Sequence, residues 1–201
     1  MEKPKSENMK NKTVFITGGS GGIGSAIAEK FLNEGYDVVA CATKTSSKTV
    51  NLEKKFRSFS SAKFQFMYGD LSTQAGVRAF CDQIPKTIIA ETRVIIHAAS
   101  IPVSYSSILQ TNWELIEKNL FINLGSLFFL VQRFLPNLQK ANFGRIVAIG
   151  SALTRNVPPN KLFHYITAKA ALSAGCKSLA VELAPYNITV NCIAPGITDT
   201  S

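Results

Sequence analysis

The chain alternates short runs of β-branched and aromatic residues with longer stretches of helical character. The runs typical of strands are KTVFIT (12–17), DVVACA (37–42), KFQFMY (63–68), RVIIHA (93–98), GRIVAIG (144–150) and ITVNCIA (188–194). The helical stretches between them cover residues 22–34, 48–60, 72–89, 112–139 and 164–185. Nearly continuous apolar strands separated by helices indicate βαβ units with a covered parallel sheet. The pattern therefore predicts an α/β fold, a doubly wound parallel sheet with helices on both faces.

The length of the chain bounds its domain organisation. Its 201 residues suit one domain with a sizeable core. Residues 1–11 are charged and are not followed by the apolar stretch of a signal peptide. We therefore expect a flexible N-terminal tail over residues 1–11 and a single domain over residues 12–201.

Composition narrows the classes of protein that the chain can belong to. A hydrophobic content of 46% without an apolar run of ~18 residues predicts a globular protein and no membrane span. The four cysteines are scattered without CxxC spacing, which favours structural thiols in a reducing, cytoplasmic setting. The net charge of +9 is dispersed, and solubility explains it more simply than an anionic cofactor or an acidic partner. No basic stripe with interleaved aromatics is present, so we expect no nucleic-acid partner.

A glycine-rich segment, TGGSGGIG (17–24), follows the first strand directly and opens the first helix. In such a segment Gly18 permits the tight turn, Gly22 lets the backbone approach a pyrophosphate, and Gly24 lets the helix pack closely. The N-terminus of the helix adds free N–H groups and a positive dipole end. The segment predicts a dinucleotide site in a Rossmann-type domain; a plain glycine-rich turn is the alternative.

The residues after the second strand distinguish the two nicotinamide cofactors. An NAD site usually has Asp or Glu here to accept from the ribose 2′-OH. Thr43, Lys44 and Thr45 instead offer hydroxyls and an ammonium, which suit a 2′-phosphate, so NADP(H) is favoured and NAD(H) stays possible. Gly21 opposes this preference, because it fills a position where a phosphate-binding Arg or Lys often lies. After the third strand, Asp70 is placed either to meet the adenine or to cap a helix.

Tyr165 and Lys169 lie four residues apart in YITAK, so one helix face carries both the phenol and the ammonium. A fixed cation favours the ionised form of a phenol. With the hydroxyl of Ser151 to hold a carbonyl oxygen, this set can move a proton to or from an alcohol. Taken singly, the three residues also suit an amphipathic pair and a strand-end turn.

At this point the chain resembles the short-chain dehydrogenase/reductase family, and within it the 3-oxoacyl-carrier-protein reductases. The landmarks that carry the resemblance are TGGSGGIG, Asp70, HAAS (97–100), Asn123, Ser151, YITAK and ITVNCIAPGITDT. The resemblance implies that Tyr165 donates the proton in ketone reduction. It implies that Lys169 assists Tyr165 and binds the nicotinamide ribose, and that Ser151 holds the substrate oxygen. Asn123 would support a water relay from Lys169.

The resemblance also assigns the residues around the cofactor. Pro195 and Gly196 would border the nicotinamide, and Thr200 would reach its carboxamide. The full set expected at the cofactor is Gly18, Ser20, Gly21, Gly22, Ile23, Gly24, Thr43, Lys44, Thr45, Asp70, Leu71, Ala98, Ala99, Tyr165, Lys169, Pro195, Gly196, Thr198 and Thr200. No metal site is expected.

The chain departs from the family pattern in two places. HAAS replaces the usual Asn-Asn-Ala-Gly, which we expect to alter packing near the cofactor, with His97 buried and hydrogen-bonded. His164 either lines the substrate entrance or lies on the surface.

The family continues past the Pro-Gly motif with a substrate-covering segment and a last strand. Because this chain ends at Ser201, the strand at 188–194 is expected to form an unpaired sheet edge.

These residues together predict an NADPH-dependent carbonyl reductase that acts on a small or carrier-bound ketone such as a 3-oxoacyl thioester. Two alternatives stay open: an NAD-dependent alcohol or sugar dehydrogenase, and a non-catalytic cofactor-binding sensor or structural subunit. A homodimer or homotetramer through helices 112–139 and 164–185 is implied by the resemblance.

Overall fold

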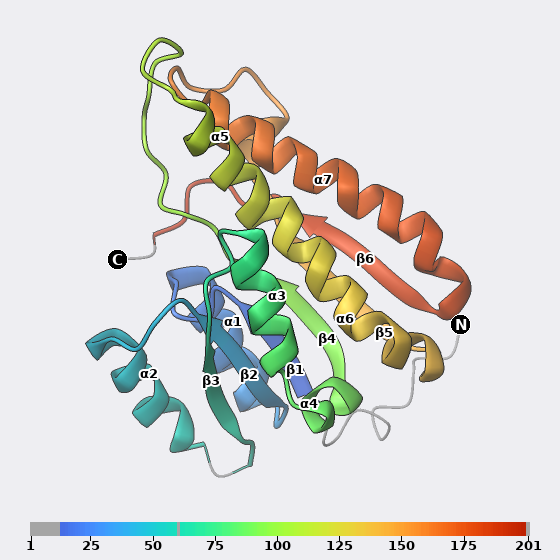
Figure 1. Ribbon diagram of the computed structural model, residues 1–201. Coiled ribbons are helices and arrows are strands. Elements are labelled where there is room, and N and C mark those ends of the chain that lie inside the picture. Colours follow the sequence, from blue (N-terminus) through green and yellow to red (C-terminus); the bar gives the residue numbers. More distant parts are fainter. Residues whose placement is uncertain (1–12, 60, 200–201) are drawn as a thin grey trace.

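Six parallel strands form one sheet in the order β3-β2-β1-β4-β5-β6 (Figure 1). In this computed structural model, which describes residues 13–59 and 61–199, the tail predicted over residues 1–11 lies outside the described part. The strands are β1 (Thr13–Thr17), β2 (Asp37–Ala42), β3 (Phe64–Tyr68), β4 (Thr92–His97), β5 (Gly144–Ile149) and β6 (Ile188–Ile193). Strand order reverses between β1 and β4, where doubly wound sheets bind ligands. The predicted Rossmann-type α/β fold is confirmed.

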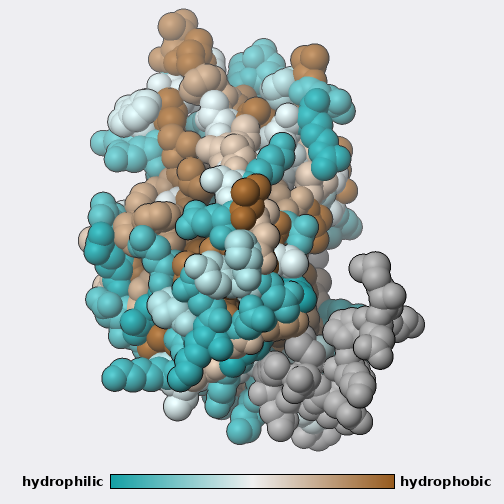
Figure 2. Space-filling view, turned by 90° about the vertical axis from the view of Figure 1, so that its right-hand side faces the viewer, coloured by the Kyte–Doolittle hydropathy of each residue, from teal (hydrophilic) through white to brown (hydrophobic). Residues whose placement is uncertain are grey.

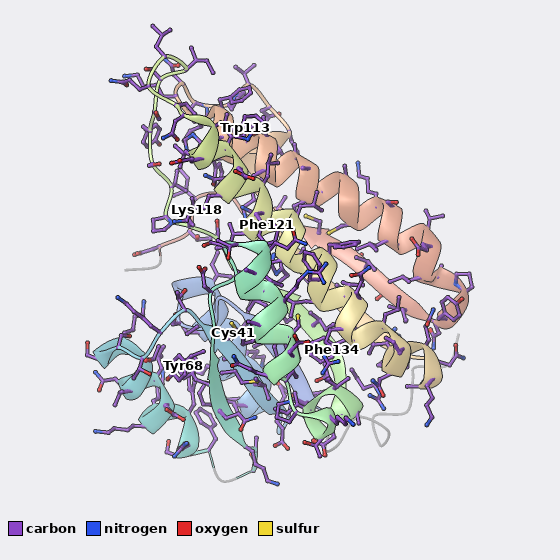
Figure 3. The ribbon with its side chains drawn as sticks, in the orientation of Figure 1. Cys41, Tyr68, Trp113, Lys118, Phe121 and Phe134 are labelled. Atoms are coloured by element: carbon purple, nitrogen blue, oxygen red, sulfur yellow. The ribbon has the colours of Figure 1, made fainter. Side chains whose placement is uncertain are left out.

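Helices cover both faces of the sheet (Figure 1). They are α1 (Gly22–Asn33), α2 (Ser47–Arg57), α3 (Gln74–Gln83), α4 (Lys86–Glu91), α5 (Trp113–Leu120), α6 (Ser126–Lys140) and α7 (Phe163–Leu183). One apolar cluster lies between the sheet and α1 and α2, and a larger one lies beneath α3, α4, α6 and α7. In the larger cluster, Phe134 of α6 points into the core, 4.9 Å from Phe15 of β1 between ring centroids (Figure 3).

Two of the predicted helices are interrupted. The stretch 72–89 divides into α3 and α4 at Ile84, which is extended because it precedes Pro85. The stretch 112–139 contains a π-helical turn, Phe121–Gly125, between α5 and α6. Such turns insert an extra residue into the helical ladder and often occur at functional sites. This one carries Asn123.

The strand β6 lies at an edge of the sheet, as predicted, and nothing within residues 13–59 and 61–199 pairs with its outer side. The helix α7 runs beside it (Figure 1). None of the described helices is long and apolar enough to span a membrane. Apolar side chains gather at the end of the molecule that carries the loop between β4 and α5 (Figure 2), where Tyr105, Ile108, Leu109 and Trp113 are exposed.

Candidate active site

Two adjoining hollows form a cleft at the carboxyl ends of the strands. One, of about 300 Å³, extends from the glycine loop to Tyr165 and Lys169. The other, of about 180 Å³, extends from the same loop to Thr43 and Leu71. Both hollows share Gly18, Gly21, Ala98 and Ser100 in their walls. The cleft is therefore elongated and is centred on the point where strand order reverses.

The glycine loop is fixed between β1, β2 and β4. Gly18 has φ +67°, and a Cβ there would lie 2.6 Å from the carbonyl oxygen of Ala98, so only glycine fits. The N–H of Gly19 donates to the carbonyl of Cys41 at the end of β2 (2.9 Å). Glycine and alanine backbone thus lines the middle of the cleft, which leaves room for a flat, elongated ligand at the N-terminus of α1.

His97 connects the glycine loop to the π-helical turn. Its Nε2 lies 2.8 Å from the backbone carbonyl of Asn123, an acceptor, so Nε2 carries the hydrogen. Its Nδ1 then accepts from the Thr17 hydroxyl (2.9 Å), which itself accepts from the N–H of Ala99 (3.2 Å). The prediction of a buried, hydrogen-bonded histidine is confirmed. Burial and then the nearby Lys169 ammonium lower the pKa of His97 to about 4.

The neutral state of His97 predicts an acid-sensitive fold. Its pKa is 6.5 ordinarily and about 4 in the folded chain, so between these values the unfolded chain binds the extra proton. Folding stability is therefore intact above pH 6.5 and falls by about 3 kcal/mol as the pH drops to 4. We expect His97→Asn to remove this part of the pH dependence, measured by urea unfolding from pH 4 to pH 7. The other titrating groups are the same in both proteins, so only His97 can make their pH dependences differ. Unfolding free energies that change equally with pH in the wild type and in His97→Asn would contradict the prediction.

Asn123 lies behind the cleft with a half-satisfied side chain. It is fully buried, and its Nδ2 donates to the carbonyl of Asn119 (2.9 Å). Its Oδ1 has no hydrogen-bond partner in the part of the chain that the structure describes. Because an unpaired buried acceptor is costly, the position calls for a water molecule or another donor.

Ser151, Tyr165 and Lys169 line the larger hollow together. Ser151 follows β5 and is 6% exposed, and its Oγ accepts from the N–H of Leu153 (3.3 Å) in a short 3₁₀ turn. Lys169 donates from Nζ to the carbonyl of Ile149 (2.8 Å), and this nitrogen lies 6.0 Å from the centre of the Tyr165 ring. The ammonium is thus held between the strand end and the phenol.

Burial changes the chemistry of Lys169. The side chain is 4% exposed, and removal from water lowers its pKa from 10.5 to about 8. Lys169 is therefore cationic at neutral pH and loses its charge in mildly alkaline solution. A hydroxyl, a phenol and a poised cation in one hollow can bind and protonate a carbonyl oxygen.

Comparison with known proteins agrees with this geometry. The family model for short chain dehydrogenase matches residues 12–201. The chain belongs to the short-chain dehydrogenase family. It is accordingly an NAD(P)-dependent oxidoreductase.

Three known proteins are similar to this short-chain dehydrogenase in sequence or in structure. A probable galactose dehydrogenase from Rhizobium meliloti is 32% identical over 100% of this chain and 77% of its own. A 3-oxoacyl-[acyl-carrier-protein] reductase from Aquifex aeolicus is 31% identical over 96% and 76%. Among solved structures, L-sorbose reductase from Gluconobacter frateurii, complexed with NADPH and L-sorbose, has a TM-score of 0.87 and 26% identity over 96% and 72%.

Most residues predicted at the cofactor of this short-chain dehydrogenase line the cleft. The larger hollow has Gly18, Gly21, Gly22, Ile23, Gly24, Ala98, Tyr165, Lys169, Pro195, Gly196 and Thr198, and the smaller one adds Ser20, Thr43, Leu71 and Ala99. Lys44, Thr45 and Asp70 are exposed and line neither hollow. Thr200 lies outside the described residues.

Two local interpretations are corrected. Asp70 does not cap α3: Thr73 does, accepting from the N–H of Gly76 (3.1 Å), while Asp70 accepts from the N–H of Ser72 (2.8 Å). His164 neither lines the cleft nor lies on the surface. It is 1% exposed, and its Nδ1 lacks a hydrogen-bond partner among the residues described.

Sequence reasoning missed the backbone that follows β4 and β5. Ser100, Ile101, Pro102 and Val103 line the larger hollow, as does Gly150. Ser100 belongs to the HAAS landmark and Gly150 directly precedes Ser151, but neither was assigned to the site, and residues 101–103 carry no motif. All of them follow strands at or next to the reversal of strand order, where ligands bind in such sheets. No group of three or more potential metal ligands occurs in the described ranges 13–59 and 61–199.

Proposed function

We propose that this short-chain dehydrogenase is an NADPH-dependent ketone reductase. The observation that carries the proposal is the single hollow that Ser151, Tyr165 and Lys169 line beside the glycine loop. The cleft fits a dinucleotide, because its middle is glycine and alanine backbone and its two hollows adjoin. When bound, the nicotinamide cofactor supplies a hydride.

The side chains of the hollow would divide the proton chemistry between them. The Ser151 hydroxyl donates a hydrogen bond to the substrate carbonyl oxygen and fixes its position. The Tyr165 hydroxyl gives its proton to this oxygen as the alcohol forms. The Lys169 ammonium, held by the Ile149 carbonyl, stabilises the phenolate that results. A water molecule that donates a hydrogen bond to the unpaired Oδ1 of Asn123 would carry protons from solvent towards Lys169.

The substrate that we propose is a ketone such as a 3-oxoacyl thioester, small or carrier-bound. The 3-oxoacyl reductase and the L-sorbose reductase among the relatives support a ketone. A second candidate is an NAD-dependent sugar dehydrogenase. It is supported by the likeness to a probable galactose dehydrogenase and by the position of Lys44 outside both hollows.

An assay of both cofactors separates these candidates. The purified protein would be tested for NADPH and NADH oxidation with 3-oxoacyl thioesters and L-sorbose, and for NAD⁺ reduction with galactose. NADPH-dependent ketone reduction supports the proposal. Turnover confined to NAD⁺ and galactose favours the NAD-dependent sugar dehydrogenase. Cofactor binding without turnover favours a non-catalytic cofactor-binding sensor or structural subunit.

Lys44 tests the basis of the cofactor preference. We expect Lys44→Glu to lower kcat/KM for NADPH by about tenfold, the worth of one charge-assisted hydrogen bond to a 2′-phosphate. With NADH the value should not fall, because the 2′-hydroxyl carries no charge. Lys54→Glu on α2 is the matched control, since Lys54 is also exposed. An equal loss with both cofactors would show that Lys44 does not read the phosphate.

The proposal extends to assembly and location. Trp113 of α5, Phe128 of α6 and Val181 of α7 are 68%, 49% and 79% exposed. These apolar side chains support a homodimer or homotetramer through the two helices at 112–139 and 164–185. All four cysteines are free, which supports a cytoplasmic setting.

A further inference from the structure

Two cysteines meet beside the active site although they are distant in sequence. Cys176 of α7 and Cys192 of β6 pack in the same apolar cluster, close enough for each sulfur to shift the pKa of the other. Cys176 is 2% exposed, whereas Cys192 is half-buried. Both line a groove of about 450 Å³ between α7 and β6, and Ser151 lines the same groove. The pair is therefore reached from the groove and borders the proposed catalytic residues.

The surroundings of the two sulfurs are unequal. Cys176, and after it Ser173, the Lys169 ammonium and the Gly150 backbone, lower the pKa of Cys192, whereas burial opposes them. The proximity of Cys176 is the largest cause that lowers the pKa of Cys192. The proximity of Cys192, together with burial, raises the pKa of Cys176. Of the two sulfurs, Cys192 is therefore the one that loses its proton more readily and Cys176 the one that keeps it, the arrangement that reactive cysteine pairs use.

The other two cysteines provide an internal contrast. Burial raises the pKa of Cys41 to about 12 and that of Cys81 to about 11, so both stay protonated. Because the thiolate is the nucleophile, these two thiols should be unreactive in the folded chain.

We propose that Cys192 and Cys176 are a peroxide-sensitive pair that closes into a disulfide beside the active site. The Cys192 thiolate attacks one oxygen of hydrogen peroxide, the O–O bond breaks, and the departing hydroxide takes up a proton as water. The resulting sulfenic acid is then attacked by the Cys176 sulfur. The S–S bond forms, the S–O bond breaks, and the hydroxyl leaves with the Cys176 proton as a second water. Two thiols lose two electrons and the peroxide gains them.

Closure would act on Lys169 through charge and through the backbone. A Cβ at Gly150 would lie 2.7 Å from the Cys192 sulfur, so this sulfur rests against the segment between Ile149 and Ser151. Ile149 provides the carbonyl that holds Lys169. The Cys192 thiolate also raises the pKa of Lys169, opposing the effect of burial. Oxidation removes this negative charge, so Lys169 would lose its proton at lower pH.

Peroxide titration of the full chain, followed by thiol alkylation and peptide mass mapping, tests the pair. We expect one dithiothreitol-reversible disulfide between Cys176 and Cys192, while Cys41 and Cys81 remain alkylatable after unfolding. In Cys176→Ala, dimedone should trap a sulfenic acid on Cys192. Cys81→Ala, the matched control, should still form the disulfide. Oxidation of all four cysteines at one rate, or free Cys176 and Cys192 after treatment of the folded wild type, overturns the proposal.

The effect on catalysis rests on the proposed function and has its own measurement. We expect the disulfide to lower ketone reduction by about tenfold at pH 8. The loss should be smaller at pH 6.5 and should disappear after reduction. A disulfide with unchanged activity at both pH values overturns the link to Lys169. An enzyme inactive towards ketones before oxidation overturns the proposed function, while mass mapping still decides whether the pair exists.

Discussion

Replacement of Tyr165 by Phe is expected to lower kcat for ketone reduction by about 10²–10⁴-fold, because it removes the proton donor alone. The ring itself can stay, since the substitution deletes only the hydroxyl. Cofactor binding, measured by fluorescence titration with NADPH, should persist, because the glycine loop and Lys169 are unchanged. The quantities to compare are kcat in steady state and the dissociation constant of NADPH.

Tyr186→Phe is the matched control for this experiment. Tyr186 lies beyond the far end of α7 in a short 3₁₀ turn, is 41% exposed and lines neither hollow of the cleft. The Tyr186→Phe substitution should therefore leave kcat for ketone reduction unchanged. If Tyr165→Phe reduced ketones as fast as the wild type, Tyr165 would not be the acid. A loss of NADPH binding in the same variant would instead indicate a structural role.

The strands of the fold were predictable because the signal for each one is local. Each buried parallel strand needs a run of apolar residues, and all six begin and end within one residue of the sequence-based bounds. The break at Ile84 followed from a local rule about the residue before proline, which the periodicity of the stretch 72–89 concealed. The π-helical turn at Phe121–Gly125 is hydrogen-bonded at the Asn123 carbonyl by His97 of β4, a partner distant in sequence that no local pattern reveals.

The site was predictable where a motif carried it. TGGSGGIG and YITAK bring their own spacing, and the structure places the glycine loop, Tyr165 and Lys169 around one hollow. The burial of His164 and the contact between Cys176 and Cys192 depend on how α7 packs, and no pattern in the sequence records that packing. Long-range neighbours of this kind come from topology alone.

Lys169→Met should separate activity from stability, because Lys169 is buried with a charge. The variant loses the cation that stabilises the phenolate, so kcat should fall by about 10²–10³-fold. At neutral pH the folding stability of the variant should not fall with its activity, because the variant no longer buries a charge. In the wild type the pKa falls from 10.5 to about 8 on folding, so below pH 8 burial of the charge costs about 3 kcal/mol.

The sign of this effect changes with pH. Between pH 8 and 10.5 the unfolded wild type keeps a proton that the folded chain has released, so wild-type stability rises with pH across this window. Met avoids the buried charge but leaves the Ile149 carbonyl without its donor, a loss of about 1–3 kcal/mol. We therefore expect Lys169→Met to be as stable as the wild type or more stable at pH 7, and less stable at pH 10.5.

Urea unfolding of both proteins from pH 7 to pH 10.5 measures this difference, and other titrating groups cancel in it. As the pH rises, the unfolding free energy of the wild type should increase by about 3 kcal/mol relative to that of Lys169→Met. Lys177→Met is the matched control, because Lys177 lies on the same helix and is exposed, so its difference should not vary with pH. A constant difference for Lys169→Met would mean that Lys169 keeps its ordinary pKa in the folded chain. Its charge would then persist in mildly alkaline solution.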